Sequence, residues 1–182
     1  MYYDGELVRL RPPERTDLTT FVSWLKNPAL RQYITIRYIS DALEERWFES
    51  YLEDMRDQSP GRLHFVIELK ASGQPIGVIS LEGINWRDRV AEVGIIIGDP
   101  DYWEQGYGTD AMRTILSIGF DWYNLYRISL NVVHDNTRAI SVYEKCGFQV
   151  EGRMRDAIFI DGEYRDLLLM SILKDEMPGG DD

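Results

Sequence analysis

The chain has 182 residues, of which 44% are hydrophobic and 12% aromatic, and this composition predicts one compact domain at 1–176 with a frayed tail at 177–182. Its formal net charge of −11 argues against a nucleic-acid partner, because neutralising phosphates requires a basic face. One cysteine and two separated histidines exclude a disulfide framework and indicate no metal site, and the lack of a secretory signal or long apolar run predicts a cytoplasmic protein with no membrane partner.

The N-terminal third predicts one strand and two helices. Residues 7–11 alternate in polarity and predict a strand, and a helix is expected at 17–26. A second helix is expected from Asp41, because Asp41 and Glu44 have the spacing of a capping box. The apolar stripe expected along this second helix consists of Leu43, Trp47, Tyr51, Leu52 and Met55.

The middle of the chain changes to a period of two residues. Ranges 63–69, 76–81 and 90–97 predict three strands, and the short links between them predict antiparallel hairpins. A helix is expected at 111–123. The strand expected at 127–133 should lie parallel to 90–97, because a helical crossover joins the two.

The C-terminal part predicts a short helix and a hairpin. The helix is expected at 136–146, and Gly147 at its end is typical of a helix terminus. Asp161 and Gly162 separate two alternating runs at 154–160 and 163–173. An Asp-Gly pair in this position predicts a tight β-hairpin turn.

The loop around Gly106 and Gly108 is the most informative segment of the chain. Two glycines allow backbone N–H groups to approach a ligand closely, and the following helix directs its positive end at the loop. The G-x-G-x-x-A spacing also occurs in dinucleotide-binding turns, but the long loop and the antiparallel strands before it disfavour that fold. No Lys-Ser or Lys-Thr pair follows, which excludes a nucleoside triphosphate loop. The segment predicts an anion site made of backbone N–H groups.

A second block lies in the expected helix at 136–146. Asn136, Ala139, Ile140 and Tyr143 are spaced so that they share one helix face. Taken singly, Asn136 has the character of a helix cap and Tyr143 that of a core aromatic. Together they place an amide and a phenol along one line, beside the end of a parallel strand.

The two blocks together resemble the GNAT superfamily of acetyl-CoA-dependent N-acetyltransferases, and within it the ribosomal-protein-alanine and spermidine N-acetyltransferase group. The match in order and spacing runs from residue 63 to residue 173, and 159–166 resembles the C-terminal hairpin of that group. Trp103 departs from the pattern, because the family often has Arg or Gln there, and a side-chain phosphate contact is lost. The resemblance implies an α/β (α+β) fold with a mixed, mostly antiparallel sheet, splayed central parallel strands and flanking helices.

The resemblance also implies a site for acetyl-CoA as co-substrate, without a metal. The edge of one splayed strand would pair with the pantetheine arm, and the glycine loop would bind the pyrophosphate. Tyr143 would protonate the departing thiolate, and Glu92 is the candidate base, acting through water. The residues expected to bind the cofactor are Ile95, Ile96, Ile97, Gln105, Gly106, Tyr107, Gly108, Thr109, Asn136, Ala139 and Tyr143.

The sequence leaves the acceptor open. A protein N-terminus or other peptide amine, a polyamine, and an antibiotic or amino-sugar amine all remain candidates, as does a non-catalytic acyl-CoA-binding module. The protein is expected to act on a small-molecule or peptide amine, and a homo-oligomer is possible. An acidic face on the second helix favours the polyamine; its residues are Glu44, Glu45, Glu49, Glu53, Asp54 and Asp57.

Overall fold

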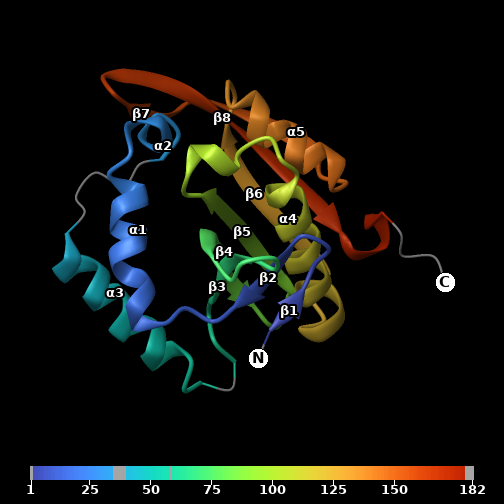
Figure 1. The fold of residues 1–182 in the computed structure, drawn as a ribbon. Helices are drawn as coiled ribbons and strands as arrows, with labels where there is room; N and C mark the ends of the chain where they lie inside the picture. Colours follow the sequence, from blue (N-terminus) through green and yellow to red (C-terminus); the bar gives the residue numbers. More distant parts are fainter. Residues whose placement is uncertain (1, 35–39, 58, 179–182) are drawn as a thin grey trace.

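The computed structural model describes residues 2–34, 40–57 and 59–178 (Figure 1). The described residues form one eight-stranded sheet in the order β1-β2-β3-β4-β5-β6-β8-β7. All neighbouring strands are antiparallel except β5 and β6, which confirms the expected mixed sheet. The strands are β1 (Tyr3–Asp4), β2 (Val8–Arg11), β3 (Leu63–Leu69), β4 (Pro75–Asn85), β5 (Val90–Ile97), β6 (Arg127–Val133), β7 (Gln149–Ile160) and β8 (Glu163–Leu173).

Helices cover both faces of the sheet (Figure 1). Along β5 the side chains alternate, so that Val93, Ile95 and Ile97 pack with α4 in the larger core cluster. Ile96 points the other way and packs in a smaller cluster with α1, α3 and Val66. The helices are α1 (Leu18–Leu25), α2 (Pro28–Arg31), α3 (Asp41–Asp54), α4 (Tyr107–Ser117) and α5 (Thr137–Lys145).

Strands β3, β4 and β5 form the consecutive antiparallel hairpins expected from their short links. The register between β4 and β5 shifts between Glu82 and Asn85, around Gly83, whose φ is +57°. Such a β-bulge bends its strand and increases the local twist. The bulge lies next to the segment where β5 pairs with β6, so the two central strands depart from a flat sheet at this point.

Helix α3 begins at Asp41 as expected, but its cap residue and its buried side differ from the expectation. Ser40, rather than Asp41, is the N-cap, and its Oγ accepts the N–H of Leu43 at 3.3 Å. The predicted stripe is wrong at Leu43 and Leu52, which are 46% and 38% exposed, and it omits Phe48, which is buried. At 100° per residue, positions 43 and 52 lie about 180° apart, so one buried side cannot include both.

Helix α4 begins earlier than expected. Gly106 is its N-cap, with φ +87°, and Tyr107 is the first helical residue, so a start at Ala111 is wrong. The error arose because both glycines were assigned to the loop, whereas Gly108 lies in the first turn. At the other end α4 continues as a π-helical segment, η3 (Ile118–Trp122), close to the expected end.

The C-terminal hairpin β7–β8 forms as expected. Asp161 and Gly162 have φ values of +49° and +91°, as the tight turn of an Asp-Gly hairpin requires. The hairpin reaches toward α2, where Arg165 Nη1 donates to the carbonyl of Gln32 at 3.4 Å (Figure 1). Met177 packs against the larger cluster. Most of the tail that was expected to fray, residues 179–182, lies outside the described residues.

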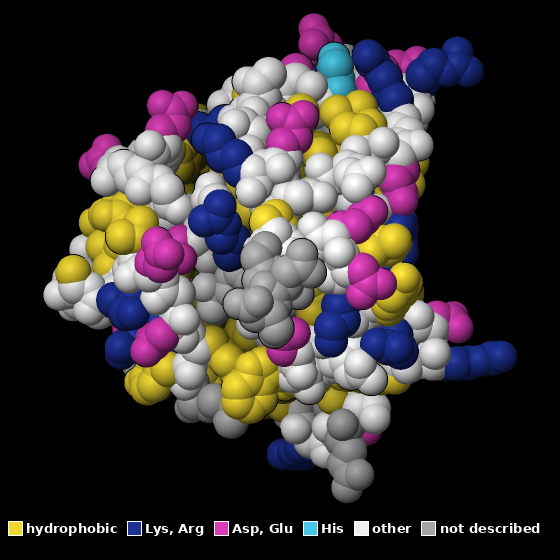
Figure 2. Space-filling model, turned by 90° about the vertical axis from the view of Figure 1, so that its right-hand side faces the viewer, with side chains coloured by type: hydrophobic (Ala, Val, Ile, Leu, Met, Phe, Trp, Pro, Cys, Tyr) yellow, Lys and Arg dark blue, Asp and Glu magenta, His cyan; other side chains and the backbone are white. Residues whose placement is uncertain are grey.

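Acidic and basic side chains are interspersed on the face shown in Figure 2. Among the described residues several arginines form ion pairs, for example Arg127 with Glu151 and Arg153 with Asp166. None of the helices in the described part of the chain is long and apolar enough to cross a membrane. Within the same residues, no three His, Cys, Asp or Glu side chains are grouped as a metal site would need.

Candidate active site

The central feature of the sheet is a gap between β5 and β6. The two parallel strands pair only where Val90–Glu92 lies beside Arg127–Ser129. Beyond that point β5 keeps its pairing with β4 as far as Ile97, and β6 keeps its pairing with β8 as far as Val133. The two strands therefore part toward their carboxyl ends, which confirms the predicted splay. We call this opening the β5–β6 gap.

The direction of the backbone groups of β5 determines which residues face the β5–β6 gap. The N–H of Gly98 donates to the carbonyl of Ile76 at 2.8 Å. The backbone N–H and C=O groups of the even-numbered residues of β5 therefore face β4. Because the direction alternates along an antiparallel strand, Ile95 and Ile97 turn their backbone groups to the gap, and Ile96 does not. This geometry narrows the predicted pairing edge from three residues to two.

The start of α4 provides backbone donors at the wide end of the gap. The first intrahelical bond joins the N–H of Asp110 to the carbonyl of Gly106, so the N–H groups of Tyr107, Gly108 and Thr109 have no partner within the helix. At Gly108 an added Cβ would meet only Ile97, at 3.8 Å. The glycine is therefore not required by packing within the described residues, and it leaves these N–H groups approachable from outside.

The loop before α4 is held in a fixed conformation. Glu104 and Gly106 both have positive φ, +60° and +87°, so the chain turns sharply twice within three residues. The side-chain amide of Gln105 donates to the carbonyl of Asp101, so this side chain stabilises the loop. The predicted phosphate-binding residues, Gln105 to Thr109, thus form one continuous turn leading into α4.

Helix α5 carries the predicted amide at its N-cap and the predicted phenol in the larger core cluster. Asn136 is the N-cap of α5, and its Oδ1 accepts the N–H of Ala139 at 3.3 Å. Tyr143 is 8% exposed, and its ring lies 5.8 Å from that of Phe148. Burial raises the pKa of Tyr143 to about 12, so the phenol keeps its proton at neutral pH. Asn136 is thus a helix cap, and the hydroxyl of Tyr143 is buried and protonated at neutral pH.

Glu92 lies on the opposite face of the sheet from Tyr143. Its neighbours Ala91 and Val93 pack in the cluster that contains Tyr143, so Glu92 points to the α1–α3 face. There its Oε1 accepts a hydrogen bond from Asn131 Nδ2 at 3.3 Å. The structure therefore places the two predicted catalytic residues on either side of the sheet that contains the gap, and it does not bring them into contact.

A second carboxylate, which the sequence analysis did not single out, lies opposite Glu92. Glu82 pairs with Glu92 across β4 and β5, and both line an open hollow of about 480 Å³. His64 Nε2 lies 2.8 Å from Glu82 Oε1. Burial opposes ionisation of Glu82, but His64, Ser80 and Arg62 together outweigh it and lower the pKa of the carboxyl. The hollow is lined by Glu82, Gly83, Val90, Ala91, Glu92, Arg127 and Ser129.

The acidic face of α3 is more neutral than its sequence indicates. Arg15 pairs with both Glu45 and Glu49. Asp54 forms an ion pair with Arg62 at 2.5 Å. These partners reduce the negative charge that α3 presents. In the hollow, Glu82 is likewise in contact with His64, whereas the exposed Glu92 accepts a hydrogen bond from the neutral amide of Asn131 and is the better candidate for contact with a cation.

Comparison with known proteins identifies relatives along nearly the whole chain. Residues 8–149 match the model of the acetyltransferase (GNAT) domain. The spermidine N(1)-acetyltransferase of Escherichia coli K12 is 38% identical over 170 residues, covering 92% of this chain and 86% of the relative. The putative ribosomal N-acetyltransferase YdaF of Bacillus subtilis 168 is 30% identical over 131 residues, covering 72% and 71%. The crystal structure of the Vibrio cholerae spermidine N-acetyltransferase with CoA and spermine has a TM-score of 0.83 at 31% identity, covering 94% of this chain and 98% of that one.

Proposed function

This chain belongs to the GNAT acetyltransferase family, and we propose that it transfers the acetyl group of acetyl-CoA directly to a primary amine of a polyamine. The observation that carries the choice of acceptor is the 38% identity to the Escherichia coli spermidine enzyme over 92% of this chain. The pair of carboxylates at the hollow supports it, because a polyamine is cationic at neutral pH and opposite charges attract.

The described residues fit a cofactor that carries amides and a pyrophosphate. Ile95 and the N–H of Ile97 offer backbone groups on the open edge of β5, where an amide-bearing arm can pair as an added strand; the carbonyl of Ile97 accepts the indole N–H of Trp103. The N–H groups at the start of α4 suit a pyrophosphate, since they have no helical partner and lie at the positive end of the helix. Residues in these positions that we assign to cofactor binding are Gln105, Gly106, Tyr107, Gly108, Thr109, Asn136, Ala139 and Tyr143.

The transfer requires a neutral amine, a polarised thioester carbonyl and a proton for the departing thiolate. Glu92, exposed on the α1–α3 face of the sheet, would take a proton from the ammonium group of the substrate through water. The nitrogen lone pair would then be free to attack the thioester carbonyl. A backbone N–H near Ile95 would polarise the carbonyl. As the C–N bond forms and the C–S bond breaks, Tyr143 would donate its proton to sulfur from the other face.

The experiment that tests this function measures thiol release from acetyl-CoA with three acceptors: spermidine, a peptide with a free N-terminal alanine, and an aminoglycoside. Spermidine is expected to give the highest kcat/KM. With spermidine, Glu82→Gln is expected to raise KM roughly tenfold, because the substitution removes one charge-assisted contact to the cationic substrate. The matched control is Glu163→Gln on β8, an exposed carboxylate outside the hollow, which should leave KM unchanged.

A peptide amine is the second candidate, and the likeness to the putative ribosomal N-acetyltransferase YdaF favours it. A higher kcat/KM for the peptide than for spermidine would replace the polyamine assignment by this one. An absence of thiol release with all three acceptors, alongside measurable CoA binding, would instead indicate a non-catalytic acyl-CoA-binding module.

A further inference from the structure

Arg138 differs from several neighbouring arginines in having no carboxylate partner among the described residues. Arg127 pairs with Glu151, and Arg165 lies 3.5 Å from Asp135. The guanidinium of Arg138 lies instead over the ring of Trp103, 3.5 Å from its centroid. In this half-buried position the planar group keeps its N–H donors available, although the chain as a whole is strongly acidic.

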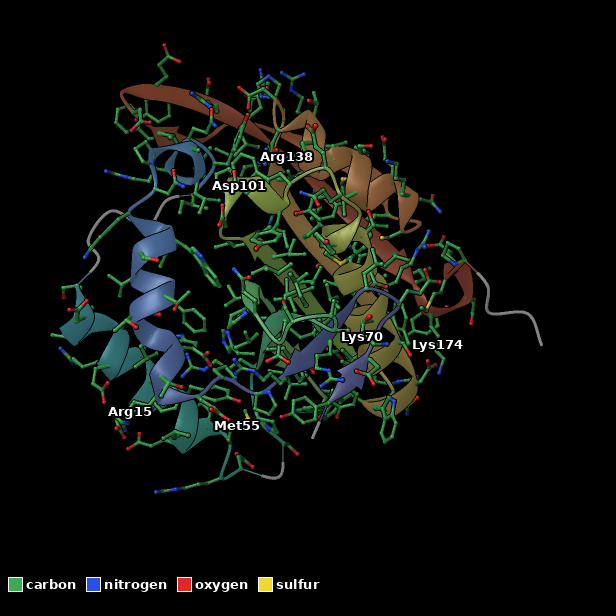
Figure 3. All side chains as sticks on the ribbon, in the orientation of Figure 1. Arg15, Met55, Lys70, Asp101, Arg138 and Lys174 are labelled. Carbon is green, nitrogen blue, oxygen red and sulfur yellow. The ribbon has the colours of Figure 1, made fainter. Side chains whose placement is uncertain are left out.

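Trp103 lies at the end of β5, on one side of the β5–β6 gap. Its indole N–H donates to the carbonyl of Ile97 at 2.9 Å, which fixes the ring at the end of β5. Arg138 comes from the first turn of α5, the element that follows β6. The stack of Arg138 on Trp103 therefore joins the two sides of the β5–β6 gap at its wide end, and Figure 3 shows Arg138 beside the loop that carries Asp101.

The same stack lies next to the backbone donors proposed for the pyrophosphate. Trp103 is followed at once by the turn of Glu104 to Gly106, which leads into the free N–H groups of α4. On this turn the side-chain amide of Gln105 is already bound to the carbonyl of Asp101. Arg138 presents a guanidinium to the same place from the opposite side of the gap.

We propose that Arg138 is the side-chain ligand of the CoA pyrophosphate, and that Trp103 holds it ready at the mouth of the β5–β6 gap. This inference rests on the proposed acetyl-CoA site. A guanidinium forms paired hydrogen bonds to phosphate oxygens and stacks on aromatic rings through its face. Arg138 can therefore turn its edge toward the pyrophosphate while its face remains on Trp103.

Calorimetric titration tests the proposal without using catalysis. CoA and dephospho-CoA, which lacks the 3′-phosphate, are titrated into the wild type, Arg138→Gln and Arg138→Lys. Arg138→Gln is expected to weaken both ligands equally, by roughly tenfold to a hundredfold. Arg138→Lys keeps the positive charge but not the planar guanidinium, so its affinity for both ligands should lie between those of the wild type and Arg138→Gln. Raising the salt concentration should reduce the difference between wild type and Arg138→Gln.

The matched control is Arg87→Gln, an exposed arginine in the turn between β4 and β5, which should bind both ligands as the wild type does. Thermal melting of each variant confirms that it is folded. Unchanged affinity in Arg138→Gln overturns the proposal, and so does a loss seen with CoA but not with dephospho-CoA, which would assign the residue to the 3′-phosphate. If the wild type binds neither ligand, the proposed function fails together with this inference.

Discussion

At the residue scale, the environment of Tyr143 decides what its hydroxyl can do. The side chain is only 8% exposed, and burial raises its pKa to about 12. A phenol with this pKa stays protonated at every physiological pH, so it can donate a proton but cannot serve as a base. The same burial raises the pKa of the Cys146 thiol to about 11, which leaves almost no thiolate for attack on an acyl group.

Replacing Tyr143 by Phe tests the donor role. The change removes only the hydroxyl, so the packing against Phe148 is kept. We expect kcat to fall by roughly a hundredfold, in the range observed for loss of a general acid. Affinity for CoA, measured by calorimetry, should remain nearly unchanged. Tyr164→Phe, at a tyrosine that is 68% exposed on β8, is the control; equal kcat in wild type and Tyr143→Phe would remove the assigned role.

Site residues that follow a local spacing rule can be predicted from the sequence, whereas those that depend on contacts between distant segments cannot. Asn136 and Tyr143 share a helix face by their spacing alone. Glu82 could have been found as well, because the hairpin of β4 and β5 places it opposite Glu92. The contact of Arg138 with Trp103 joins two segments 35 positions apart on opposite sides of a gap, and no local pattern predicts it.

At the element scale, the start of α4 depends on a carboxylate in its own first turn. Asp110 accepts the N–H groups of Glu6, Leu7 and Val8 at 2.9, 2.8 and 2.9 Å. These donors come from the N-terminal segment more than 100 residues earlier, so the sequence shows Asp110 only as an acidic residue near a helix start. The contact ties β2 to the helix that carries the proposed pyrophosphate donors.

Removing this tie should affect both stability and binding. Asp110→Ala leaves three N–H groups without their acceptor, and we expect the free energy of unfolding to fall by about 2–3 kcal/mol. Urea denaturation measures this change, and calorimetry should show weaker CoA binding because the start of α4 loses its support. Asp175→Ala, at an exposed residue after β8, is the control. Stability equal to that of the wild type would show that Asp110 does not hold the two elements together.

At the scale of the whole molecule, the sheet is held on both sides of the β5–β6 gap while the gap itself has no backbone pairing. Hairpins β3–β4–β5 secure one side, and β6–β8–β7 secure the other. Sequence periodicity predicted these strands and their directions, since each depends on local alternation and link length. The length of the paired segment, only Val90–Glu92 with Arg127–Ser129, depends on contacts between segments distant in the sequence, which periodicity does not contain.

The second side of the gap carries a side-chain tie across its three strands, and this tie gives the stability a defined pH dependence. Arg127 on β6 contacts Glu151 on β7 and donates to Ser171 Oγ on β8 at 2.8 Å. Hydrogen bonds from Arg127 and then from Ser171 lower the pKa of Glu151 to about 2. Because this folded-state pKa lies below the unfolded value of roughly 4.3, the tie stabilises the fold above that value. The stabilisation is lost as the pH falls toward 2.

Glu151→Gln tests this dependence directly. At pH 7 we expect the free energy of unfolding to fall by roughly 0.5–1 kcal/mol, because the pair is partly exposed and solvent screens it. The difference from the wild type should shrink between pH 4 and pH 2, where protonation removes the charge of Glu151 in the wild type as well. Urea denaturation at a series of pH values measures it, with Glu163→Gln as a control whose small effect should not vary with pH. A difference that persists undiminished at pH 2 would show that the tie depends on shape and not on the ionised carboxylate.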